Sequence, residues 1–104
     1  MARILALPVG QETALRVRVL NGAGLLAWQQ SDTDAAQALQ EEALALARQL
    51  GDAAAIGFSL YCLGDTARLR GDYPTARALL EDALRVGRDA GSRTVEAWSV
   101  GALG

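Results

Sequence analysis

The chain matches itself when it is shifted by 40 residues, and this internal repeat restricts the possible folds more than any other feature of the sequence. Residues 20–51 and 60–91 align without a gap, and the identical pairs least expected by chance are Gly24/Gly64, Asp32/Asp72, Glu41/Glu81, Arg48/Arg88 and Gly51/Gly91. A third copy begins at Trp98 and Ser99, which repeat Phe58 and Ser59. Such a period is typical of stacked units that each bury an apolar face against a neighbour.

The second half of each copy has the apolar spacing of an amphipathic helix. In the first copy its apolar residues form one stripe of a 3.6-residue helix, comprising Ala36, Leu39, Ala43, Leu46, Ala47 and Leu50. The first half is apolar on more than one side, as Leu20, Leu25 and Trp28 illustrate. That pattern is expected of a helix with neighbours on two sides. Each copy is therefore predicted to be a pair of helices.

Capping residues indicate where these helices begin and end. Asp32 and Asp72 stand where a side-chain oxygen accepts hydrogen bonds from the free N–H groups of a first turn. Pro74 suits a first turn, because its missing N–H is not needed there. Gly51 and Gly91 stand where a helix ends in a left-handed residue. The predicted helices cover residues 12–29, 33–50, 53–70, 74–90 and 93–103.

Glycines inside the first helix of each copy indicate close packing. A glycine in a helix interior costs about 1 kcal/mol relative to alanine, so the recurrence of Gly24 as Gly64 predicts a crossing too tight for a larger side chain. Gly22 is interpreted in the same way. Together with Gly24 and Ala27 it also fits the dinucleotide-binding pattern G-x-G-x-x-A. The packing interpretation is preferred, because the second copy lacks the first glycine and no second strand follows.

These features resemble the tetratricopeptide repeat. The resemblance rests on Gly-x-x-Ala in the first helix, on paired alanines in the second, and on the turn Gly71–Tyr73. The usual period of that family is about 34 residues, and a 40-residue unit looks like the longer variant of bacterial LuxR-type transcription activators and related signalling ATPases. The chain departs from the family at Ala23, where leucine is favoured, and at Gln40, where an aromatic residue is usual.

The resemblance implies an all-α, right-handed α-solenoid of antiparallel helix hairpins with about two and a half repeats. The expected organisation is an N-terminal lead-in over residues 1–11, followed by a tetratricopeptide-like domain over residues 12–104. Its repeats would cover residues 12–51, 52–91 and, cut short, 92–104.

Composition excludes several classes of function. A net charge of −2 and a pI near 5.0 give no basic footprint for nucleic acid, and no apolar run approaches the length of a membrane helix. Histidine is absent, which removes the common nucleophile systems and most zinc sites, so no cofactor or metal is expected. The single cysteine, Cys62, is predicted to be a buried apolar residue of a protein in the reducing cytoplasm. The adjacent acids Glu41–Glu42 and Glu81–Asp82 are interpreted as a solvated face.

The resemblance also suggests a binding face, because the first helix of each tetratricopeptide repeat lines the concave side of the solenoid. The residues at the corresponding positions are Arg18, Asn21, Leu25, Trp28, Phe58, Tyr61, Asp65, Arg68 and Trp98. Trp28 and Tyr61 are expected to face the groove as binding anchors. For Phe58 and Trp98, a place in the core between repeats is an equal alternative.

The function predicted from these observations is a non-catalytic scaffold that recognises a protein or peptide within a larger bacterial regulator. The alternative is a structural spacer or self-association module whose groove binds no free ligand. A third repeat without its second helix would leave apolar side chains uncovered, notably Val95, Trp98, Val100 and Leu103. A homodimer joined through residues 93–103 is therefore a further prediction.

Overall fold

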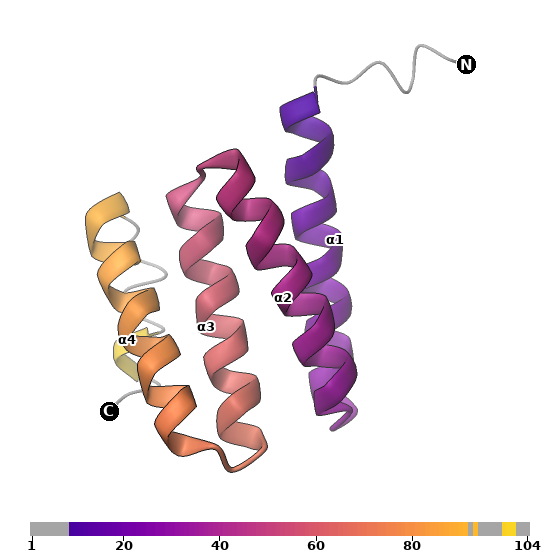
Figure 1. Cartoon of the computed structure of the whole chain (residues 1–104), viewed down its shortest axis with the longest axis vertical. Coiled ribbons are helices and arrows are strands. Elements are labelled where there is room, and N and C mark those ends of the chain that lie inside the picture. The colour runs from indigo at the N-terminus through magenta and orange to yellow at the C-terminus, as the bar shows by residue number, and fades with distance from the viewer. Residues whose placement is uncertain (1–8, 92, 94–98, 102–104) are drawn as a thin grey trace.

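The computed structural model describes residues 9–91, 93 and 99–101. Within them lie the helices α1 (Val9–Gln29), α2 (Thr33–Leu50), α3 (Ala53–Leu69) and α4 (Tyr73–Ala90). Consecutive helices run antiparallel and lie side by side, so the chain forms two successive hairpins (Figure 1). The predicted all-α architecture of stacked helix pairs is confirmed.

The helix bounds agree closely with the predicted ones, with one larger difference. The helix α1 begins at Val9, three residues before the predicted start at residue 12. Glu12, the first residue of the predicted helix, therefore lies within the first turn of α1. A carboxylate there interacts favourably with the positive end of the helix dipole. Of the predicted fifth helix, Arg93 and residues 99–101 are helical, and the rest lies outside the described residues.

The capping interactions are those that the sequence predicts. The side chain of Asp32 accepts from the backbone N–H of Ala35 at 3.2 Å, and that of Asp72 accepts from Thr75 at 3.4 Å. Gly51 and Gly91 end α2 and α4 in the left-handed region, with φ of 68° and 71°. The turn inside each hairpin also contains a residue with a left-handed backbone. In the second copy this residue is Gly71, and in the first it is Ser31, which is unusual because Ser31 has a side chain.

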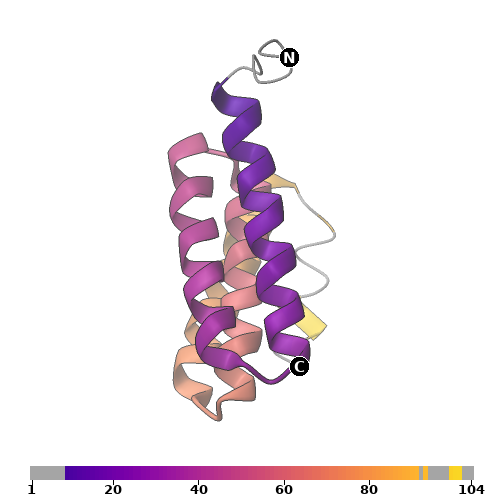
Figure 2. The same cartoon turned by 90° about the vertical axis from the view of Figure 1, so that its right-hand side faces the viewer.

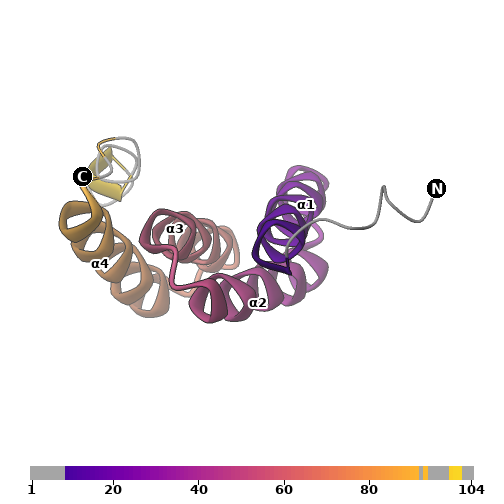
Figure 3. The same cartoon turned by 90° about the horizontal axis from the view of Figure 1, so that it is seen from above.

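The helices form two layers. In Figure 3, α1 and α3 lie on one side of the molecule and α2 and α4 on the other. The helices α1 and α3 touch each other, whereas α2 and α4 do not, so the stack curves toward α1 and α3. The first helices of both repeats therefore line the concave side, and α1 stands at one end of the stack (Figure 2). None of the described helices is long and apolar enough to span a bilayer.

The core is built from small side chains at close helix crossings. Ala43 and Ala47 of α2 are fully buried against Val17 of α1. A Cβ atom on Gly64 would lie 2.8 Å from Leu80 Cγ, and one on Gly24 would lie 2.9 Å from Gln40 Cγ. These two contacts are related by the 40-residue shift, so the predicted packing role of both glycines is confirmed.

Gly22 does not share this role. It is exposed, and a Cβ atom added there would meet nothing within 4 Å. It lies on the side of α1 that faces away from α2, so the prediction that it serves packing within the chain is wrong. The dinucleotide-binding alternative also lacks its geometry, since residues 16–27 lie inside one helix and form no strand-to-helix turn.

Two buried polar contacts join the repeats. Asn21 of α1 donates through Nδ2 to the hydroxyl of Ser59 in α3 at 3.2 Å. The amide nitrogen of Gln40, oriented toward the backbone, donates to the carbonyl oxygens of Ala36 and Cys62 at 3.3 Å each. Its amide oxygen then accepts from the Thr66 hydroxyl at 3.2 Å. The opposite orientation would turn the amide oxygen toward two carbonyl oxygens.

Candidate binding groove

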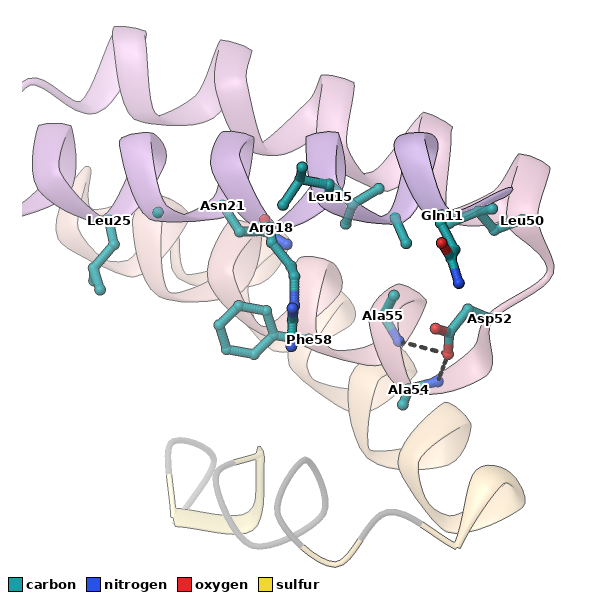
Figure 4. Close-up of a pocket in the computed structure, with 13 residues that line it drawn as sticks. Gln11, Leu15, Arg18, Asn21, Leu25, Leu50, Asp52, Ala54, Ala55 and Phe58 are labelled. Carbon is teal, nitrogen blue, oxygen red and sulfur yellow. Dashed lines mark hydrogen bonds between the residues drawn. The ribbon is translucent and has the colours of Figure 1, made fainter. Parts of the chain in front are cut away.

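A groove of about 850 Å³ lies between α1 and the first half of α3, on the concave side (Figure 4). The helix α1 contributes Gln11, Leu15, Arg18, Asn21 and Leu25 to its lining, among others, and the opposite wall includes Leu50, Asp52, Ala54, Ala55 and Phe58. The residues from α1 recur at spacings of three and four, so they share one face of the helix. The groove is therefore a consequence of how α1 is turned against α3.

The chemistry of the groove is mainly apolar with charges at separate places. Leu15 and Leu25 line the groove and remain 50% and 48% exposed, so they present apolar surface to it. Figure 4 shows the Arg18 side chain extending from α1 toward the Phe58 side of the groove. Asp52 lies at the other end, where its carboxylate accepts from the N–H groups of Ala54 and Ala55 at the start of α3. Arg18 is thus the charge most available to a ligand among the described lining residues.

Four of the nine predicted site residues line this groove: Arg18, Asn21, Leu25 and Phe58. Asn21 is only 6% exposed and is hydrogen-bonded to Ser59, while its Oδ1 atom has no partner among the described residues. Its main contact is therefore with the neighbouring repeat. Phe58 is partly buried and lines the groove as well, so the two roles considered for it coexist.

The other predicted site residues lie outside the groove lining. Trp28 is half-buried, and its Nε1 atom is enclosed without a hydrogen-bond partner among the described residues. The ring of Tyr61 stacks on Phe58 with centroids 6.5 Å apart. Burial, and next the Asp65 carboxylate, raise the pKa of the Tyr61 hydroxyl. Asp65 and Arg68 form an ion pair with each other, and Trp98 lies outside the described residues.

Several lining residues were not expected from the sequence. Gln11 and Leu15 belong to the first turns of α1, the end of the helix that was predicted too short. Leu50 is the last residue of α2 and Asp52 directly precedes α3, and the predicted binding face included neither. The sequence did contain one indication of this lining, namely that Leu15, Arg18 and Leu25 are spaced along one face of a helix.

A smaller hollow of about 370 Å³ lies among α2, α3 and α4. Its polar groups bind one another. Arg70 contacts the carboxylate of Asp34 at 2.7 Å and the amide oxygen of Gln37 at 2.9 Å, and Gln37 donates to Glu41 at 3.0 Å. These interactions join the two hairpins near their turns, so this hollow is better explained as a structural contact than as a binding site.

The adjacent acidic residues and the cysteine are the other chemically notable side chains that the structure describes. Glu41, Glu42 and Glu81 are exposed, and Asp82 pairs with Arg85 at 2.8 Å. Among the described residues, no group of three or more acidic or cysteine side chains is placed to hold a metal ion. Cys62 is 8% exposed, which confirms that it is buried. Burial, and next the Asp65 carboxylate, raise the pKa of its thiol from 9.0 to about 12.

The Cys62 thiol is expected to be almost inert in the folded protein. At pH 8 a thiol with a pKa of about 12 holds a negligible fraction of reactive thiolate, and the side chain is enclosed by α3 and its neighbours. Alkylation by iodoacetamide at pH 8 should be at least about a hundredfold slower than in the guanidinium-unfolded chain. Equal rates in the two states would show that Cys62 is accessible.

Comparison with known proteins agrees with this geometry. No curated protein matches the chain. The family model described as tetratricopeptide repeat matches residues 15–89, a span that contains both helical hairpins except the first turns of α1 and the last residue of α4. Because this match covers well over half of the 104 residues, the chain belongs to the tetratricopeptide repeat family.

Proposed function

We propose that the chain is a non-catalytic scaffold that binds a segment of another protein in the groove between α1 and α3. Tetratricopeptide repeats generally bind proteins or peptides, which supports the general class. The observation that carries the specific proposal is the open apolar groove with Leu15 and Leu25 half exposed beside it. Exposed apolar surface in a concavity is typical of a site for a protein or ligand.

The lining indicates the chemistry of the bound segment. The leucines and Phe58 favour aliphatic or aromatic side chains, and Arg18 favours a carboxylate among them. The segment is therefore an apolar peptide or helix face with an acidic residue. Trp28, Tyr61, Asp65, Arg68 and Trp98 are retained in the proposal as further contacts of the bound segment, on the resemblance to the repeat family alone.

The cellular setting is part of the proposal. The 40-residue repeat resembles the long variant in LuxR-type regulators and related signalling ATPases, and this resemblance supports a role in a bacterial signalling or transcriptional regulator in the cytoplasm. In that setting, the groove would bind a regulatory segment of a partner protein.

Selection of twelve-residue peptides on the immobilised chain, followed by calorimetric titration of the recovered peptides, tests the groove. The recovered peptides should contain leucine or phenylalanine together with aspartate or glutamate. Arg18→Glu and Leu25→Ser should each weaken binding about tenfold or more. The first change removes the attraction for an acidic residue of the peptide, and the second removes an apolar contact with it. The unfolding midpoint should change little, since both side chains are largely exposed.

Matched controls are available on other faces. Leu69 is 46% exposed, nearly the same as Leu25, and Arg85 lies on α4, which contributes no residue to the groove. Leu69→Ser and Arg85→Glu repeat the same chemical changes and should leave the peptide affinity unaltered. If the controls weaken binding as much as the groove variants, the groove is not the site. If the folded chain selects no peptide, the spacer alternative is favoured.

A further inference from the structure

The groove between α1 and α3 carries opposite charges at two separate points along its length. Arg18 extends from α1 beside Phe58, and Asp52 lies at the end where α1 contributes Gln11 (Figure 4). Gln11 stands seven residues before Arg18 in α1, and Asp52 stands six residues before Phe58. At a rise of about 1.5 Å per residue, the two walls agree on a separation of about 9 to 10 Å between the charged positions.

Both charges keep atoms available to a ligand. Arg18 is exposed, and its guanidinium has no hydrogen-bond or ion-pair partner among the described residues. The N–H groups of Ala54 and Ala55 both donate to Oδ1 of Asp52, so its Oδ2 atom accepts from none of the residues that the structure describes. The positive end of a helix balances only about half of a unit charge. The Asp52 carboxylate therefore still attracts a cation.

The separation of the two charges favours a helical ligand. Side chains on one face of an extended strand repeat about every 6.6 Å, and the residue about 10 Å further along points to the opposite face. In a helix, the residue seven positions further lies about 10.5 Å along the axis and on the same face. A helix can thus present one residue to Arg18 and another to Asp52 at once. The residues between them face Leu15, which lies between Gln11 and Arg18 on the groove wall.

The direction of the groove walls decides which charge comes first in that ligand helix. Consecutive helices of the chain are antiparallel, so α1 and α3 both begin at the Asp52 end of the groove. Their positive ends lie together there, and a ligand helix that runs antiparallel to them brings its negative C-terminal end to the same place. A basic residue is favoured near the C-terminal end of a helix and an acidic one near its N-terminal end. Both preferences match the positions of Asp52 and Arg18.

We propose that the groove binds its ligand helix in one direction, with an acidic residue at Arg18 and a basic residue seven positions later at Asp52. Apolar residues three and four positions after the acidic residue contact Leu15. This inference rests on the proposed function, because it specifies the segment that the groove takes. A segment with the two charges exchanged meets a like charge at both points, so the groove rejects it.

Two designed peptides test the order of the charges. Both are rich in alanine and leucine, have blocked termini and are about eighteen residues long, which is enough to form a helix. The forward peptide carries a glutamate seven positions before a lysine, and the reversed peptide has these two residues exchanged. Calorimetric titration at low ionic strength should give the forward peptide at least about tenfold higher affinity. Circular dichroism checks that the two peptides have the same helix content.

Asp52→Asn isolates the second charge, because asparagine caps a helix about as well as aspartate does. The substitution should weaken the forward peptide about threefold, since the lysine loses its partner, and strengthen the reversed peptide about threefold, since the glutamate is no longer repelled. Asp32→Asn is the matched control. Asp32 caps α2 in the same way but does not line the groove, so its substitution should change neither affinity.

The outcomes separate this inference from the proposed function. Equal binding of both peptides, unaltered by Asp52→Asn but weakened by Arg18→Glu, would overturn the charge order and leave the groove as a peptide site. Tighter binding of the reversed peptide would overturn the direction. If neither peptide binds, the inference fails, and the peptide selection decides separately whether binding in the groove fails with it.

Discussion

Replacing Gly64 with leucine is expected to lower the free energy of unfolding by about 2 to 3 kcal/mol. A Cβ atom at this position would lie 2.8 Å from Leu80 Cγ, 2.9 Å from its Cδ2 and 3.3 Å from the carbonyl oxygen of Ala76. Because a backbone oxygen of α4 also lies only 3.3 Å away, a rotamer change of Leu80 alone would not relieve all of the crowding. The two helices of the hairpin would have to separate, and their remaining contacts would weaken. Guanidinium unfolding followed by circular dichroism measures the loss.

Two control substitutions separate overpacking from other effects. Gly22→Leu makes the same chemical change in a helix interior where a Cβ atom meets nothing within 4 Å. It should raise stability by about 0.5 to 1 kcal/mol, since leucine favours helix more than glycine does. Leu69→Ala removes a half-exposed side chain and should cost less than about 1 kcal/mol. Equal midpoints for Gly64→Leu and Leu69→Ala would show that the recurring glycine is not a packing contact.

The repeat register explains why the fold could be predicted in detail. Gly24 and Gly64 each lie against equivalent positions of the second helix, so comparing the two copies identified contacts between helices. The ends of α2 were predicted correctly because Asp32 and Gly51 act locally, through hydrogen bonds and a left-handed φ. The start of α1 has no comparable capping residue, and there the prediction was three residues short.

The binding face was predicted less well, because it depends on how each helix is turned about its axis. Trp28 and Leu25 were both expected on this face. Leu25 lines the groove, whereas Trp28 is not among the lining residues and its Nε1 atom is enclosed. A periodicity of 3.6 residues defines a face only to within about one residue. Gly22 illustrates a second limit, since two glycines two positions apart point to different sides of a helix, and only Gly24 meets a neighbour.

The contact between Gln40 and Thr66 gives the second large prediction. Both side chains are at most 2% exposed, and they join α2 to α3 at the point where the repeats meet. Gln40→Leu should lower the free energy of unfolding by about 1 to 2 kcal/mol, because the Thr66 hydroxyl loses its partner on α2 inside the protein. Leucine itself fits this place, since Leu80 occupies the equivalent position beside Gly64. The loss would therefore come from the hydrogen bond and not from shape.

The double variant Gln40→Leu, Thr66→Val decides between these causes. Replacing both partners by apolar groups of similar shape leaves no unpaired hydroxyl or amide, so its stability should return to within about 0.5 kcal/mol of the original chain. The coupling between the two sites, measured by guanidinium unfolding of all four chains, should be about 1 to 2 kcal/mol. Losses that simply add would mean that Gln40 and Thr66 do not stabilise each other. Recovery would show that the repeats stack equally well through an apolar pair.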